Sequence, residues 1–121
     1  MEFNWVKARS ECSLKRAFEL LHEEVKTDVE IANQLDLGAT FHSAYQHKKI
    51  IVTREENDDE IRSVIFELLP TGMCARVGQS QPMFVAKPRL SELGECLFEV
   101  DGQTYKLWQI CQKALEDLLF A

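Results

Sequence analysis

Asp28 occupies a position in the sequence that could support chemistry. It falls among Leu21, Val25 and Ala32 on the apolar side of a predicted amphipathic helix. Burial disfavours an ionised carboxylate and raises its pKa, as a general acid or base requires. A structural role competes and is favoured, because no second titratable partner can be named. Residues 27–30 have the T-x-x-E form of a capping box, so the helix could kink or restart with Asp28 near a new N-terminus.

Cys12 is the best candidate for a reactive thiol. Arg9, Lys15 and Arg16 are close to it in the sequence, and positive charges near a helix start stabilise a thiolate. No nearby histidine could serve as its base, so a small residue packed at the helix start is the favoured interpretation.

The cysteine spacing predicts free thiols. The chain contains Cys12, Cys74, Cys96 and Cys111. These positions match neither a zinc site nor a close-packed disulfide framework, so we expect all four to be reduced. Cys111 falls on an apolar helical stripe and is expected in the core.

No motif for cofactor or metal binding is present. His42 and His47 are five residues apart in a predicted strand and so point to opposite faces, and His22 lies at the edge of a helical stripe. The five glycines fall at predicted turns or ends, with no phosphate-binding loop. We therefore expect no metal, no cofactor and no catalytic constellation.

The charge pattern disfavours some partners and suggests others. A net charge of −6 makes nucleic acid an unlikely partner. Residues 55–60 carry five negative charges but lack the glycine of an EF-hand, so a solvated hairpin tip is favoured over a cation site. Lys7, Arg9, Lys15 and Arg16 form a basic cluster that opposes the helix dipole. One hypothesis is that this cluster docks on an acidic partner, such as the 55–60 loop of a second copy, although simple solubility is somewhat favoured.

A long amphipathic helix is predicted from Ser13 to Leu37. Ser13 can cap its start, and Gly38 is suited to a left-handed exit. The predicted buried face consists of Leu14, Phe18, Leu21, Val25, Val29, Ala32 and Leu35. Residues 3–12 fit a short strand or a backward extension of this helix equally well.

After Gly38 the apolar period changes to two, which predicts strands. The expected strands are 40–47, 50–52, 61–69, 73–77, 83–87 and 96–100. Apolar residues on both faces of 61–69 predict a central strand covered on both sides, and Pro88 is expected to end the fifth strand at a sheet edge. A closing amphipathic helix has the stripe Leu107, Ile110, Cys111, Ala114 and Leu118.

These elements predict a single α+β domain over residues 1–121, an antiparallel β-meander of about five to six strands flanked by a long N-terminal and a C-terminal amphipathic helix. The order and size of the elements are similar to those of type III secretion chaperones and other small sheet-and-helix domains. The similarity is one of fold only.

The predicted function is that of a small cytoplasmic, non-enzymatic binding module. It would act in protein interaction, as an adaptor or chaperone-like protein, through a sheet face and terminal-helix surfaces. A homodimer is plausible, and no membrane partner is expected because no leader or spanning segment is visible. The candidate partner-binding residues are Phe3, Trp5, Arg9, Lys15, Arg16 and Phe120. The alternative is a small-ligand pocket protein or a small enzyme using Asp28 or Cys12.

Overall fold

The computed structural model describes residues 3–56 and 60–120. The elements in chain order are α1 (Trp5–Glu11), α2 (Leu14–Gln34), β1 (Thr40–Gln46), β2 (Lys49–Glu56), β3 (Glu60–Leu69), β4 (Gly72–Val77), β5 (Pro82–Leu90), β6 (Cys96–Val100), β7 (Gln103–Tyr105) and α3 (Leu107–Phe120). The protein is therefore α+β, with helices at both ends of a β-meander, as the sequence predicts.

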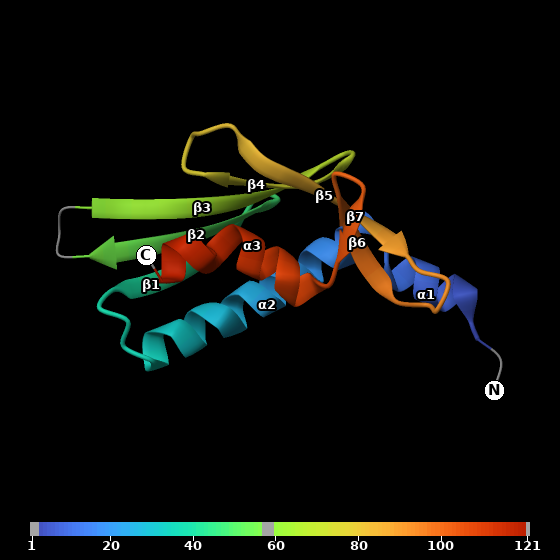
Figure 1. Cartoon of the computed structure of the whole chain (residues 1–121), viewed down its shortest axis with the longest axis horizontal. Helices are drawn as coiled ribbons and strands as arrows, with labels where there is room; N and C mark the ends of the chain where they lie inside the picture. The colour runs from blue at the N-terminus through green and yellow to red at the C-terminus, as the bar shows by residue number, and fades with distance from the viewer. Residues whose placement is uncertain (1–2, 57–59, 121) are drawn as a thin grey trace.

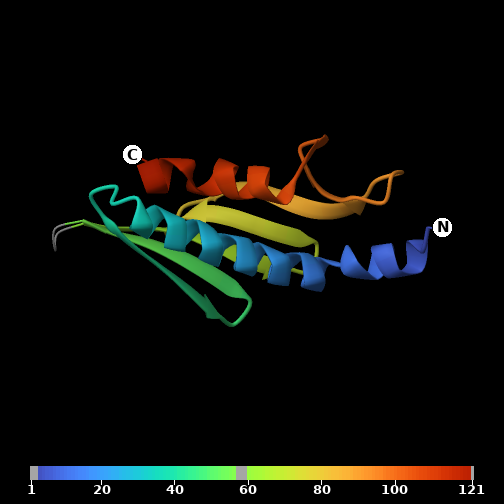
Figure 2. The same cartoon turned by 90° about the horizontal axis from the view of Figure 1, so that it is seen from below.

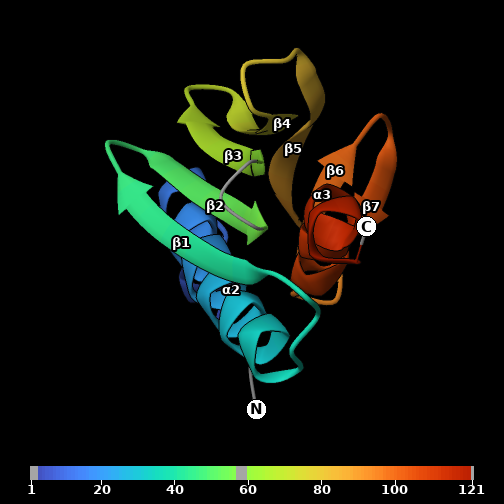
Figure 3. The same cartoon turned by 90° about the vertical axis from the view of Figure 1, so that its left-hand side faces the viewer.

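The seven strands form one antiparallel sheet in the order of the sequence. The sheet is strongly curved, and α2 and α3 both lie inside the curve (Figure 3). The two helices run side by side in the same direction (Figures 1 and 2). This arrangement lets each helix bury one apolar stripe against the sheet.

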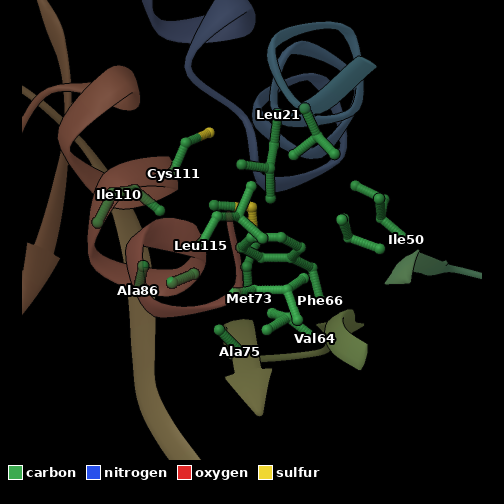
Figure 4. Close-up of a cluster of buried hydrophobic side chains, with 14 of the residues drawn as sticks. Leu21, Ile50, Val64, Phe66, Met73, Ala75, Ala86, Ile110, Cys111 and Leu115 are labelled. Atoms are coloured by element: carbon green, nitrogen blue, oxygen red, sulfur yellow. The ribbon is translucent and has the colours of Figure 1, made fainter. Parts of the chain in front are cut away.

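The core fills the space between the helices and the concave face of the sheet. Alternation along β2 and β3 points Ile50 and Phe66, which face each other across the two strands, into this space. Leu21 of α2 and Leu115 of α3 meet them from the helices (Figure 4). Each of these fully buried side chains contributes roughly 1.5–3 kcal/mol relative to exposure.

The described residues form seven strands, one more than the upper end of the predicted range of five to six. β7 follows the tight turn at Asp101 and Gly102, where both residues have positive φ, and Gly102 is one of the five glycines that fall at predicted turns or ends. The strand itself is short and mostly exposed, so it carries no apolar alternation to reveal it. The turn between β1 and β2 is also left-handed, at His47 and Lys48, without a glycine.

The N-terminal end of α2 is as predicted, but its C-terminal end is not. Ser13 Oγ accepts a hydrogen bond of 3.2 Å from the backbone N–H of Arg16 and so caps the helix. The helix ends at Gln34, three residues before the predicted Leu37. Asp36 is the first left-handed residue, and Leu35 is exposed rather than part of the buried face.

The side chain of Asn33 explains this earlier end. Its amide nitrogen donates to the carbonyl oxygen of Phe41, and its amide oxygen accepts from the Phe41 N–H, both at 2.9 Å. These two bonds hold the start of β1 against the last turn of α2, so the chain must reverse before residue 41.

Two strand predictions were also wrong in part. β3 is central, but α2 and α3 both lie on the concave face, and on the convex face Ile65 is buried whereas Ile61 is exposed. β5 does not stop before Pro88, which pairs with Phe98 of β6. Because β4 pairs with β5 only as far as Ala86, that edge of β5 is unpaired at Pro88, where a residue without an N–H is tolerated.

Residues 5–11 form a short helix, α1, that is tied to the sheet. Asn4 Oδ1 caps α1 by accepting from the Lys7 N–H at 3.0 Å. Cys12, directly after α1, forms a disulfide with Cys96 at the start of β6, with their Cα atoms 5.3 Å apart. The prediction that all four cysteines are reduced was therefore wrong, because the two partners lie 84 positions apart and only the fold brings them together.

Candidate functional site

A groove runs between α2 and α3. Its volume is about 310 Å³. Its lining comes from the C-terminal half of α2 and from most of α3: Glu24, Asp28, Ile31, Ala32, Leu35, Trp108, Cys111, Gln112, Leu115, Glu116, Leu119 and Phe120. Because the two helices are parallel, successive turns of α2 face successive turns of α3 along the groove.

The groove has a buried apolar floor and an exposed apolar rim. Ala32 and Leu115 are buried at the floor. On the rim, Trp108 is 54% exposed and Phe120 is 66% exposed, and Ile31 is also exposed. Large apolar side chains gathered around a groove are typical of a surface that binds a partner or ligand.

Asp28 lies on the α2 side of this groove and is half-buried. Desolvation, followed by the negative charge of Glu24 one turn earlier, raises the pKa of Asp28 to about 6. The burial of this carboxyl group therefore agrees with the helical-wheel prediction.

The competing capping-box interpretation of Asp28 was wrong. α2 is continuous from Leu14 to Gln34, so no new N-terminus forms at residue 28. Instead, the Thr27 hydroxyl donates a hydrogen bond of 3.1 Å to the carbonyl oxygen of Glu23. This bond is typical of a hydroxyl inside a helix.

Cys111 lies across the groove on α3, and its thiol is buried as predicted. Burial raises its pKa well above the ordinary range, and the charges of Asp28 and Glu24 raise it further. A thiol held protonated in this way is a poor nucleophile. Cys12 is not a free thiol either, because its sulfur is bonded to Cys96.

The charged residues that line the groove are all acidic. Glu24, Asp28 and Glu116 contribute carboxylates, and the residues named above that line the groove include no lysine, arginine or histidine. An apolar floor with carboxylates along its sides favours a ligand that combines apolar groups with positive charge.

The predicted partner-binding residues are divided between two ends of the molecule. Phe120 lies in the groove, whereas Phe3, Trp5 and Arg9 belong to the α1 end, beyond the N-terminus of α2 (Figure 2). Arg9 shares a hollow there with Lys87 and Arg89 of β5.

The remaining charged candidates are placed as follows. Arg16 pairs with Glu19 at 3.1 Å, and Lys15 is exposed. In the acidic run 55–60, Glu55 lies 3.4 Å from His42 and Glu56 lies 3.1 Å from Arg54, while 57–59 lie outside the described residues. The predicted docking of the basic cluster on this loop therefore stays a hypothesis.

Several lining residues were not sequence candidates. Glu24, Ile31 and Trp108 each stand beside an apolar stripe rather than on it, and only the parallel placement of the helices turns those flanks toward each other. The helical wheel does contain one signal, since Ile31 is a large apolar residue outside the buried stripe of α2.

No group of three or more His, Cys, Asp or Glu side chains that could hold a metal ion is found within residues 3–56 and 60–120. His22 instead packs against Tyr45 with ring centroids 4.8 Å apart. In the same ranges, no helix is long and apolar enough to span a bilayer.

The chain matches no protein-family model, no curated protein and no solved structure. Its function must therefore be argued from the groove itself.

Proposed function

We propose that this protein is a non-enzymatic binding module whose groove between α2 and α3 takes an apolar, positively charged segment of a protein partner. One observation carries the proposal: exposed aromatic and aliphatic side chains surround a hollow whose charged lining residues are carboxylates. An amphipathic helix with apolar residues and a lysine or arginine on one face matches this lining.

The energetic reasons favour such a partner over a purely apolar one. Filling the groove removes Trp108 and Phe120 from water, and aromatic side chains in grooves are common binding hot spots. Filling it also desolvates Asp28, whose charge is already disfavoured by burial. A cation from the partner offsets that cost, whereas a neutral segment does not.

The test uses fluorescently labelled synthetic helical peptides and fluorescence anisotropy. One peptide has a leucine face flanked by lysines, and the other carries glutamates at the lysine positions. We expect only the cationic peptide to bind. The double variant Glu24→Gln, Asp28→Asn should weaken it by about tenfold or more, as should Trp108→Ala.

The control is Val85→Ala, which removes an exposed apolar side chain from β5, away from the groove, and should leave binding unchanged. Equal binding of the two peptides, no binding of either to the monomeric chain, or unchanged affinity in the groove variants would each overturn the proposal.

An enzyme using Asp28 is the second candidate, since a carboxyl group with a pKa of about 6 can exchange protons near neutral pH. The groove lining supplies no hydroxyl, amine or ionised thiol to work with it, because the Cys111 thiol is held protonated. Binding is therefore the better-supported function.

The cytoplasmic location stays a prediction. The Cys12–Cys96 disulfide bears on it, because stable disulfides are typical of oxidising compartments. Fractionation of cells that produce the tagged chain, followed by a count of free thiols in each fraction, would test the location and the disulfide together.

A further inference from the structure

α1 is a helix without a buried face. None of its residues is buried: Trp5 is 65% exposed and Val6 is also exposed, as is Phe3 just before the helix. Exposed apolar residues of this size on one short helix call for a partner surface. The same helix carries the cations Lys7 and Arg9.

The position of α1 prevents it from filling the groove of its own chain. It lies beyond the N-terminal end of α2, whereas the groove lies along the C-terminal half of that helix (Figures 1 and 2). The Cys12–Cys96 disulfide fixes the C-terminal end of α1 to β6, so α1 stays beyond the N-terminal end of α2 and away from the groove.

We infer that α1 of a second copy of this chain occupies the groove, with Trp5 on the apolar floor and Arg9 between Glu24 and Asp28. This inference rests on the proposed function and names the partner. It draws on the complementary charge of the two surfaces, since α1 offers cations beside apolar residues and the groove offers carboxylates beside an apolar floor.

The spacing of these side chains on α1 matches the spacing of the groove residues on α2. Trp5 and Arg9 are four residues apart and share one side of α1, about 6 Å along its axis. Glu24 and Asp28 have the same spacing on α2, and Ile31 and Leu35 continue the groove lining one and two turns farther on. Arg9 at Glu24 and Asp28 therefore places Trp5 beside Ile31 and Leu35.

This placement fixes the direction of the docked helix. Arg9 lies toward the N-terminal end of α2 and Trp5 toward its C-terminal end, so the docked α1 runs antiparallel to the α2 that it contacts. Within one chain, α1 leads directly into α2 in the same general direction (Figure 2). The second copy is therefore reversed end for end, as a two-fold axis across α2 requires, and each copy fills the other's groove.

Sedimentation equilibrium on the full chain over a concentration series tests this inference. We expect a dimer that Arg9→Glu and Glu24→Arg each weaken by about tenfold or more, since each places like charges together at the centre of the interface. The double variant Arg9→Glu, Glu24→Arg restores opposite charges in each groove and should recover dimerisation. Arg62→Glu, which reverses an exposed cation on β3, is the control and should have no effect.

Recovery in the double variant would not follow from a merely structural role of either residue. A dimer insensitive to the single variants, or one that the double variant fails to recover, would overturn the inference. A monomer at every concentration that still binds the cationic peptide would overturn the inference but leave the proposed function standing. A monomer that binds no peptide would overturn both.

Discussion

The guanidinium group of Arg54 on β2 donates a hydrogen bond of 2.7 Å from Nη1 to the carbonyl oxygen of Leu118, in the last turn of α3. Arg54 is only 3% exposed, and its Nη2 donates to Glu56 at 3.1 Å. The cation also lies 5.7 Å from the centroid of the Phe41 ring. Arg54 thus joins the sheet to the negative end of the helix dipole of α3, which forms one wall of the groove.

Removing Arg54 should destabilise the fold. Arg54→Ala deletes the bond to Leu118 and leaves a buried carbonyl oxygen and a cavity, so we expect a loss of about 3 kcal/mol in the free energy of unfolding. Arg54→Lys keeps the charge but not the planar guanidinium group, and should lower the free energy of unfolding by roughly half as much. Urea denaturation measures both. Arg62→Ala, at the exposed position paired with Arg54 on β3, should change stability by less than ~0.5 kcal/mol, and an equal loss there would contradict the explanation.

The disulfide predicts a specific thiol count. Unfolded under non-reducing conditions, the protein should show two titratable thiols, Cys74 and Cys111, and four after reduction. Four thiols without reductant would show that Cys12 and Cys96 are not bonded.

The thermal stability of the protein should also depend on the Cys12–Cys96 disulfide. The bonded cysteines are 84 residues apart, and the chain-entropy account assigns a loop of this size about 4.5 kcal/mol. A reducing agent should therefore lower the melting temperature of the wild-type protein. The double variant Cys12→Ser, Cys96→Ser serves as the control, because its melting temperature should be low and should not respond to the reductant.

Asp28 predicts a pH dependence of stability. Its pKa is raised from 3.8 to about 6 in the folded protein, so the folded state binds this proton more tightly than the unfolded state. Stability is therefore favoured at low pH and falls as pH rises through the window from about 4 to about 6. Glu24 on α2 and Cys111 and Glu116 on α3 face the same groove, and the negative charge of Glu24 adds to the effect.

Asp28→Asn should remove this pH-dependent loss. Near neutral pH we expect the variant to be more stable than the wild type by about 1 kcal/mol, a value reduced for solvent screening of a half-buried group. The gain should vanish below the unfolded pKa. Urea midpoints across the pH range measure it, and Asp117→Asn, an exposed carboxylate on α3, should show no such trend. A gain of equal size at low pH would mean that the charge is not its cause.

Gly72 should tolerate no side chain. A Cβ atom there would lie 2.8 Å from the carbonyl oxygen of Ala86 and 2.9 Å from Val85 Cγ1, because β4 passes close to β5 at this point. Gly72→Ala must push the two strands apart, and we expect a loss of about 2 kcal/mol in thermal or urea unfolding. Ser80→Ala, in the exposed turn after β4, should be neutral. A neutral Gly72→Ala would show that the strands separate without cost.

The sequence by itself determined the class of the fold and most of its elements. Apolar residues at a period of 3.6 place α2 and α3, and the period of two after Gly38 places the strands, because each element must turn one face toward a common core. The caps and turns that depend on local chemistry were also readable, such as Ser13 at the start of α2 and the turn at Asp101 and Gly102.

The tertiary structure decided the features that depend on residues far apart in the chain. The Cys12–Cys96 bond, the early end of α2 at Asn33 and the burial of Arg54 each need a partner that no local pattern reveals. The groove also depends on residues that are far apart in the chain. Its carboxylates and aromatic residues lie on the flanks of two helices separated by the whole sheet in sequence, and only the curvature of that sheet brings α2 and α3 side by side.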